Sequence, residues 1–214
     1  MIAVTADQVP RALTALRDRA EGPIFLQSNL HNYGLATDSH DRRALHLWRN
    51  ANWTAFAGLT AGGVLMPQMR DANPDDWRDL RQALVGCQIS GLNGTATQVS
   101  RALDVLSLTE APTNLDREEP CFNLNLADMT LPDVTGFDCK PLQEADRGLL
   151  HDWRIAYRVE IMGDSVNTAA EDAGREIDEW FRDNSHRLLW QGAQPVALAG
   201  INARLPSLVQ IGGV

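Results

Sequence analysis

The spacing of apolar residues changes several times in the first third of the chain, and each change predicts a different element. Helical spacing over 7–21, closed by Gly22, predicts an amphipathic opening helix, and the apolar stretch 24–35 predicts a shorter second one. Three extended runs follow, at 44–49, 53–59 and 64–69. Ala61-Gly62-Gly63 is placed to turn the last two into a hairpin. We therefore expect two helices followed by a three-stranded meander.

The next stretch predicts helices that alternate with strands. Asn73 followed by Pro74 provides a helix cap and a first-turn proline, and Gly86 follows the apolar stripe of this helix. Gly94 opens another helix. Two strands complete the pattern, one at 87–92 and one at 122–126, where apolar residues alternate with asparagines. Strands joined by crossover helices are expected to be parallel, so we expect parallel pairing here.

The segment 128–136, with one proline and one glycine, predicts a boundary between two domains. Beyond it the pattern predicts a strand, two helices and then three strands. The expected elements are a strand at 137–142, a helix that starts at 143–146 and ends at Gly163, a helix at 169–182, and strands at 187–190, 195–203 and 208–214. The first of these helices has Leu150, Trp153, Tyr157 and Ile161 on one face.

Composition and charge narrow the classes of function. The 214 residues have a net charge of −9 and a single lysine, Lys140, so no basic patch is available for nucleic acid. No apolar run approaches the roughly 20 residues of a membrane helix, and the N-terminus does not resemble a signal peptide. We expect a cytoplasmic protein without a membrane or nucleic-acid partner. Its cysteines are expected to be reduced thiols, and its histidines have no metal-site spacing.

The order strand, helix, helix and antiparallel meander resembles the opening half of the fold of the GNAT superfamily of N-acetyltransferases. Residues 140–146 look like the family's first strand entering its first helix, and 196–200 and 210–214 look like its third and fourth strands. The earlier part resembles the degenerate N-terminal half of two-domain members. The resemblance implies an α+β fold (α/β mixed sheet) of two GNAT-like domains, the second incomplete. Residues 1–135 would be a GNAT-like N-terminal domain without catalysis, and 136–214 the first half of an acyltransferase domain.

This resemblance implies an acyl-CoA-dependent N-acyltransferase, with acetyl-CoA as acyl donor and a primary amine of a small molecule or peptide as acceptor. In the family, the fourth strand hydrogen-bonds the pantetheine arm of the cofactor. Ile211, Gly213 and Val214 align with that role. The alternative is that Gly212-Gly213 marks only a bulge or a strand end.

The family's glycine-rich pyrophosphate loop has no counterpart in this chain, so we expect the second domain to stop before it and the cofactor site to be incomplete. The corresponding connection in the first domain, 68–74, has no glycine and includes acidic residues, which would repel phosphate. We expect the first domain not to bind coenzyme A in the usual way.

Glu160 is the candidate general base, because it lies at the edge of the apolar face of its helix, one turn after Tyr157. Its alternative role is that of a solvated glutamate paired with an arginine. Asn202 and Arg204, on the less apolar face of the 195–203 strand and its extension, are candidate substrate-binding residues. Six acidic residues would favour a cationic amine or simply form a solvated face: Asp164, Glu171, Asp172, Glu176, Asp178 and Glu179.

A different class of function is compatible with the same residues. An exposed final strand at 208–214 would pair with another chain, and the protein would then be a catalytically silent binding or regulatory module. If this alternative is correct, we expect the protein to form an oligomer through this strand.

Overall fold

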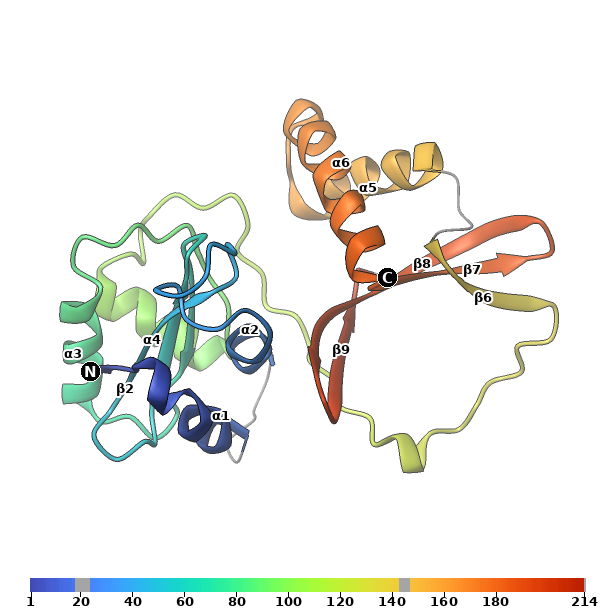
Figure 1. Ribbon diagram of the computed structural model, residues 1–214. Helices are drawn as coiled ribbons and strands as arrows, with labels where there is room; N and C mark the ends of the chain where they lie inside the picture. Colours follow the sequence, from blue (N-terminus) through green and yellow to red (C-terminus); the bar gives the residue numbers. More distant parts are fainter. Residues whose placement is uncertain (18–23, 143–146, 214) are drawn as a thin grey trace. The chain divides into compact units, whose positions relative to one another are not determined.

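The computed structural model of the chain describes residues 1–17, 24–142 and 147–213 (Figure 1). It is a mixed α+β structure with two β-sheets. The chain divides into two compact units. The first comprises Met1–Ala111 and Ala203–Leu208, and the second comprises Pro112–Asn202 and Val209–Val214. The segment 128–136 lies within the second unit, in the irregular chain that leads to its first strand.

The sheet of the first unit contains the predicted meander. Its strands lie in the order β1 (Ile2–Ala3), β2 (Leu45–Arg49), β3 (Phe56–Thr60), β4 (Val64–Gln68) and β5 (Gly91–Leu92). All neighbours are antiparallel except β4 and β5, which are parallel. The hairpin between β3 and β4 and the parallel crossover to β5 are therefore confirmed. The sequence pattern missed β1, which is only two residues long.

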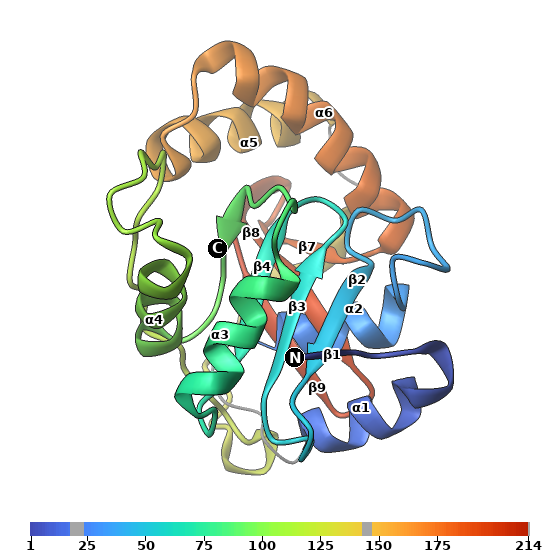
Figure 2. The same ribbon diagram turned by 90° about the vertical axis from the view of Figure 1, so that its left-hand side faces the viewer.

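Four helices cover the two faces of this sheet. One layer is α1 (Val9–Arg17) and α2 (Phe25–Tyr33), and the other is α3 (Pro74–Ala83) and α4 (Ala96–Leu106). The first layer packs on the side that carries Leu45 and Phe56, and the second on the side that carries Ala57 and Leu65. Figure 2 shows α3 lying over the sheet. Strand β3 is buried on both faces because it lies between the two layers.

The predicted start of α3 is confirmed. The Asn73 side chain accepts hydrogen bonds from the backbone N–H groups of Asp75 and Asp76, and the Asp76 carboxylate accepts one from the Asn73 N–H. This reciprocal capping box satisfies backbone donors that the first turn of a helix leaves free.

The elements of the second sheet and its two helices follow in the predicted order, and residues 203–208 of its last hairpin are grouped with the first unit. The elements are β6 (Phe137–Pro141), α5 (Arg147–Met162), α6 (Val166–Asp183), β7 (His186–Gln191), β8 (Gln194–Leu205) and β9 (Leu208–Gly212). The strands form one sheet in the order β6-β7-β8-β9. Helices α5 and α6 run beside each other on the sheet (Figure 1), and their shared core contains Leu142, Leu150, Ile177 and Leu188. The predicted helix start at 143–146 lies outside the described residues.

Two details of the prediction are wrong. The segment 122–126 is not a strand, and its Phe122, Leu124 and Leu126 side chains are 88%, 57% and 75% exposed. No strand lies beside this segment among the described residues. Alternation of apolar and polar residues is therefore not sufficient for a strand, which also needs a neighbour to pair with. The strand expected at 87–92 is shorter, because only Gly91 and Leu92 pair with β4.

Gly200 gives a test of the packing in the second unit. It pairs with His186 across β7 and β8, and a β-carbon at residue 200 would lie 2.2 Å from Nε2 of that buried ring. Trp180 stacks on the ring with centroids 4.0 Å apart, so the ring cannot move aside freely. Gly200→Ala should lower the free energy of unfolding by roughly 1–3 kcal/mol.

Gly174, in α6, is the matched control for this substitution. A β-carbon there meets open space, so Gly174→Ala should raise the free energy of unfolding by about 0.5–1 kcal/mol. Chemical denaturation of both variants measures the two changes. Equal midpoints for Gly200→Ala and the parent protein would contradict the described contact with His186.

Candidate functional site

The end of β9 is the first part of the candidate site. Strand β9 is last in the order of its sheet, so its outer edge has no strand neighbour within the described residues. Ile211 is 64% exposed there. Gly213 follows the strand with a φ of 66°, a left-handed conformation that favours glycine, and a β-carbon at this position would meet nothing within 4 Å. The third residue of the predicted set, Val214, lies outside the described residues.

At residue 212, the close approach of another side chain favours glycine. A β-carbon at residue 212 would lie 2.2 Å from the side-chain nitrogen of Asn202, so the Asn202 amide lies directly against the β9 backbone. This places one candidate substrate-binding residue beside the segment expected to hold the cofactor. Gly212 also ends β9, as the alternative interpretation expects. The geometry therefore agrees with both interpretations, and the cofactor role stays a prediction.

Arg204 is held through its backbone. Its N–H donates to Ser28 Oγ at 3.0 Å, and its carbonyl accepts from Ser28 Oγ at 3.1 Å and from Asn32 Nδ2 at 2.9 Å. These three residues belong to the first unit, and the Arg204 side chain is exposed. The sequence pattern missed Ser28 and Asn32, because polar residues inside a short helix gave no signal of a distant backbone partner.

Glu160 lies two residues before the end of α5, and its side chain is exposed. In the described part of the chain, no hydrogen bond or ion pair joins it to Asn202 or to β9. The predicted alternative of a glutamate paired with an arginine is likewise not observed among those residues. The structure therefore does not assemble Glu160 and the β9 residues into one group, and its role stays a prediction.

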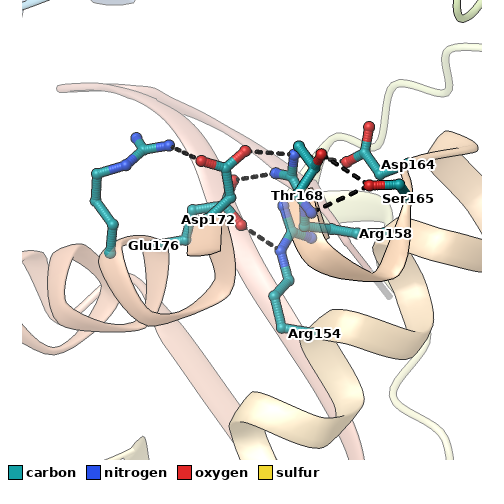
Figure 3. Close-up of polar contacts among 8 residues, drawn as sticks. Arg154, Arg158, Asp164, Ser165, Thr168, Asp172 and Glu176 are labelled. Carbon is teal, nitrogen blue, oxygen red and sulfur yellow. Dashed lines mark hydrogen bonds and ion pairs between the residues drawn. The ribbon is translucent and has the colours of Figure 1, made fainter. Parts of the chain in front are cut away.

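A buried ion-pair cluster links α5 to α6 (Figure 3). Arg158, 8% exposed, contacts Asp164 at 2.6 Å, Asp172 at 2.7 Å and Glu176 at 2.7 Å. Arg154 Nε also donates to Glu176, at 2.5 Å. We call this group the Arg158 cluster.

Several of the acidic residues noted in the sequence are therefore already paired. Arg175 contacts Asp172 at 2.5 Å, and Arg147 contacts Asp178 at 2.6 Å. The Asp172 carboxylate raises the pKa of Arg175, because its hydrogen bond stabilises the charged guanidinium. Internal pairing makes these carboxylates poor attractors of a cationic amine, so they do not support the predicted preference for one.

The sequence pattern missed Arg158 as a buried residue. Arg154 and Arg158 are one helical turn apart, and so are Asp172 and Glu176. This matched spacing of two arginines and two carboxylates was the signal in the sequence that two adjacent helices could form ion pairs. The sequence pattern instead predicted that the apolar and aromatic residues of α5 face the core. Ile161, expected on the inward face, is 39% exposed.

His186 is buried beside this cluster. Its Nδ1 lies 2.8 Å from Ser185 Oγ, and its ring stacks on Trp180. Burial, and to a lesser extent the nearby charge of Arg154, together lower the pKa of His186 to about 4. The ring is thus a neutral core group. The described residues contain no cluster of histidine, cysteine and carboxylate side chains suited to a metal ion.

Comparisons with protein-family models, curated proteins and solved structures gave no significant match. Among the described helices, none has both the length and the apolar character needed to cross a membrane. The assignment of function therefore depends on the residues and geometry above.

Arg158 provides a stability test with a matched control. Arg158→Met leaves three carboxylates without their shared partner, so the free energy of unfolding should fall by about 3–5 kcal/mol. Arg175 is half exposed and contacts one of the same carboxylates, so Arg175→Met should cost only about 0–1 kcal/mol. Urea denaturation of both variants measures the difference. Similar losses for the two would show that Arg158 does not organise the cluster.

His186 provides a test against pH. Its pKa is about 4 in the folded protein, below the ordinary value of 6.5, so the unfolded chain binds more protons between these two values. The free energy of unfolding should therefore rise from pH 4 to pH 6.5. Above pH 6.5 the titration of His186 should not change it further. His186→Phe should flatten the rise, and His31→Phe, at an exposed position, should not. Melting temperatures across this range measure the slopes.

Proposed function

We propose that this protein is an acyl-CoA-dependent N-acyltransferase of the GNAT type, which transfers an acyl group, taken here as acetyl, to a primary amine. The observation on which the proposal depends is the end of β9, an edge strand that is followed by Gly213, which has a positive φ and open space where a β-carbon would lie. The order β6, α5, α6, β7, β8 and β9 supports it. In the first unit, the order of antiparallel meander, crossover helix and parallel strand supports a second GNAT-like domain.

In the proposed reaction, the main chain of β9 holds the acyl donor. The arm of acetyl-CoA would extend along the outer edge of β9 as an added strand, with backbone groups as its hydrogen-bond partners. The amine nitrogen attacks the thioester carbonyl carbon, the carbon–sulfur bond breaks, and the coenzyme A thiolate leaves. Glu160 would accept the proton that the amine loses, directly or through water. Asn202, which lies against Gly212, would border the acceptor.

The first unit would not take part in cofactor binding. The backbone N–H groups of Asp75 and Asp76 at the start of α3 already donate to the Asn73 side chain. The two carboxylates of this first turn also oppose a phosphate group, which needs free N–H groups and a positive potential. These contacts support the expectation that the first domain has no catalytic role.

Two matched glycines test the cofactor proposal. Gly213 and Gly192 both have positive φ, of 66° and 60°, and both face open space, so alanine should strain the two positions equally. Only Gly213→Ala places a methyl group beside the proposed cofactor edge. We expect the parent protein and Gly192→Ala to show a saturable thermal shift with acetyl-CoA, and Gly213→Ala to bind about ten-fold more weakly, the loss expected from one to two backbone contacts.

Release of free thiol from acetyl-CoA in the presence of a panel of primary amines measures the reaction itself. The absence of both a thermal shift and thiol release in the parent protein would refute the acyltransferase proposal. If the two glycine variants bind acetyl-CoA equally well, the cofactor does not bind at the end of β9.

The second candidate function, a binding module that pairs through β9, is favoured by one observation. Val209 and Ile211, on this edge strand, are 45% and 64% exposed, and an apolar edge strand is a template for another chain. This function predicts a dimer in light-scattering measurements and a monomer for Ile211→Lys. A parent protein that is monomeric at high concentration would exclude it.

A further inference from the structure

The segment 112–136 of the second unit is exposed along its whole length, and in Figure 1 it is the irregular chain that leads to β6. It nevertheless contains many large apolar side chains: Leu115, Phe122, Leu124, Leu126, Met129, Leu131 and Val134. A concentration of exposed apolar side chains marks an interaction surface, because apolar surface gains free energy when it leaves water. We therefore asked which partner this segment fits.

The middle of the segment has the side-chain pattern of a strand. Residues 122–126 read Phe-Asn-Leu-Asn-Leu, so apolar and amide side chains alternate. Among the residues that the structure describes, no hydrogen bond uses the backbone of residues 121–124, and no strand lies beside them. The backbone groups of this stretch are therefore available to a neighbouring strand from another chain.

The chain limits this stretch on both sides. Pro120 has no N–H group to donate to a ladder, and a 3₁₀ turn begins at Leu126. Glu118, Glu119 and Asp128 place negative charges at the two ends, which oppose pairing beyond the stretch. The part available for pairing is thus about five to six residues long, the length of an ordinary strand.

The pattern of the stretch reads the same in both directions, as pairing with a second copy about a two-fold axis requires. With the axis at Leu124, this residue faces the same residue of the second copy. Phe122 then faces Leu126, and Asn123 faces Asn125. All the apolar side chains meet on one face of an antiparallel pair, and all the amides meet on the other.

Charge favours the antiparallel arrangement over a parallel one. In a parallel pair in register, Glu118 and Glu119 would each face the same residue of the second copy, and like charges directly opposite each other destabilise a ladder. In the antiparallel pair, Glu118 faces Thr130 and Glu119 faces Met129. The antiparallel pair therefore has no like charges directly opposite each other.

We propose that residues 122–126 form an antiparallel β-pair with the same residues of a second copy of this chain, about a two-fold axis at Leu124. A two-stranded pair is only marginally stable in water, so the dimer is weak and forms at high protein concentration. The proposal uses neither β9 nor acetyl-CoA. It is therefore independent of the proposed acyl transfer and of pairing through β9.

Disulfide trapping tests the register of this pair. The background carries Cys87→Ser, Cys121→Ser and Cys139→Ser, which remove the exposed thiols. Mild oxidation should then trap Leu124→Cys as a dimer, because β-carbons of directly opposite residues are about 5 Å apart, close to the spacing in a disulfide. Leu126→Cys is the matched control. Residue 126 faces residue 122 and lies about 13 Å along the strand from its own counterpart, so this variant should not be trapped.

Sedimentation velocity at high protein concentration measures the association itself. Leu124→Asp removes two apolar side chains from the centre of the pair and places two like charges face to face, so it should weaken the dimer about ten-fold. Leu131→Asp adds the same charge at a side chain that is 76% exposed and lies outside the paired stretch, so it should leave the dimer unchanged. All the replaced leucines are exposed, and no core contact is lost in these variants.

A parent protein that remains monomeric would overturn the proposal. Equal trapping of Leu124→Cys and Leu126→Cys would also overturn it, because it would indicate parallel pairing or random collision. A dimer that is lost in Ile211→Lys and kept in Leu124→Asp would assign the contact to β9 instead. Acetyl-CoA binding by the parent protein reports separately on the acyl transfer, so the two proposals succeed or fail independently.

Discussion

The need of every backbone and buried polar group for a hydrogen-bond partner shapes both units of this protein. Within a sheet, neighbouring strands meet this need, and where a ladder stops another partner has to meet it. In the first unit, Pro67 stops the pairing of β4 with β5, and the Gln98 side chain takes over at the Met69 N–H. In the second unit, β9 is the last strand of its sheet, and we propose that the thioester arm lies along its outer edge.

Buried charge imposes a second constraint on the second unit. Arg158 is enclosed between α5 and α6, and a guanidinium is tolerated there because carboxylates from α6 and from the connection between the two helices surround it. The same pairing occupies acidic groups that an amine substrate would otherwise meet. If the proposed function holds, other residues would have to select the acceptor amine, and the Asn202 amide, which lies against the β9 backbone, is a candidate.

The candidate site was predicted unevenly, and the reason is physical. Gly213 and the apolar residues of β9 are visible in the sequence, whereas the positive φ of Gly213 was not predicted from it. The contacts of Ser28 with the Arg204 backbone and of Asn202 with Gly212 join residues from different elements. Such contacts depend on how strands and helices pack, and periodicity contains no information about them. For the same reason the burial of Arg158 was missed.

The sequence by itself determined the order of most elements, because helix caps, glycine stops and apolar periodicity act over a few residues. The capping box at Asn73 and the Gly163 stop of α5 are examples. It did not determine which alternating segment becomes a strand. The segment 122–126 alternates as a strand should, yet it is exposed and has no strand neighbour among the residues that the structure describes. Only the tertiary structure decided that, and only it brought Asn202 against Gly212, because strand pairing and burial are properties of the partner that a segment meets.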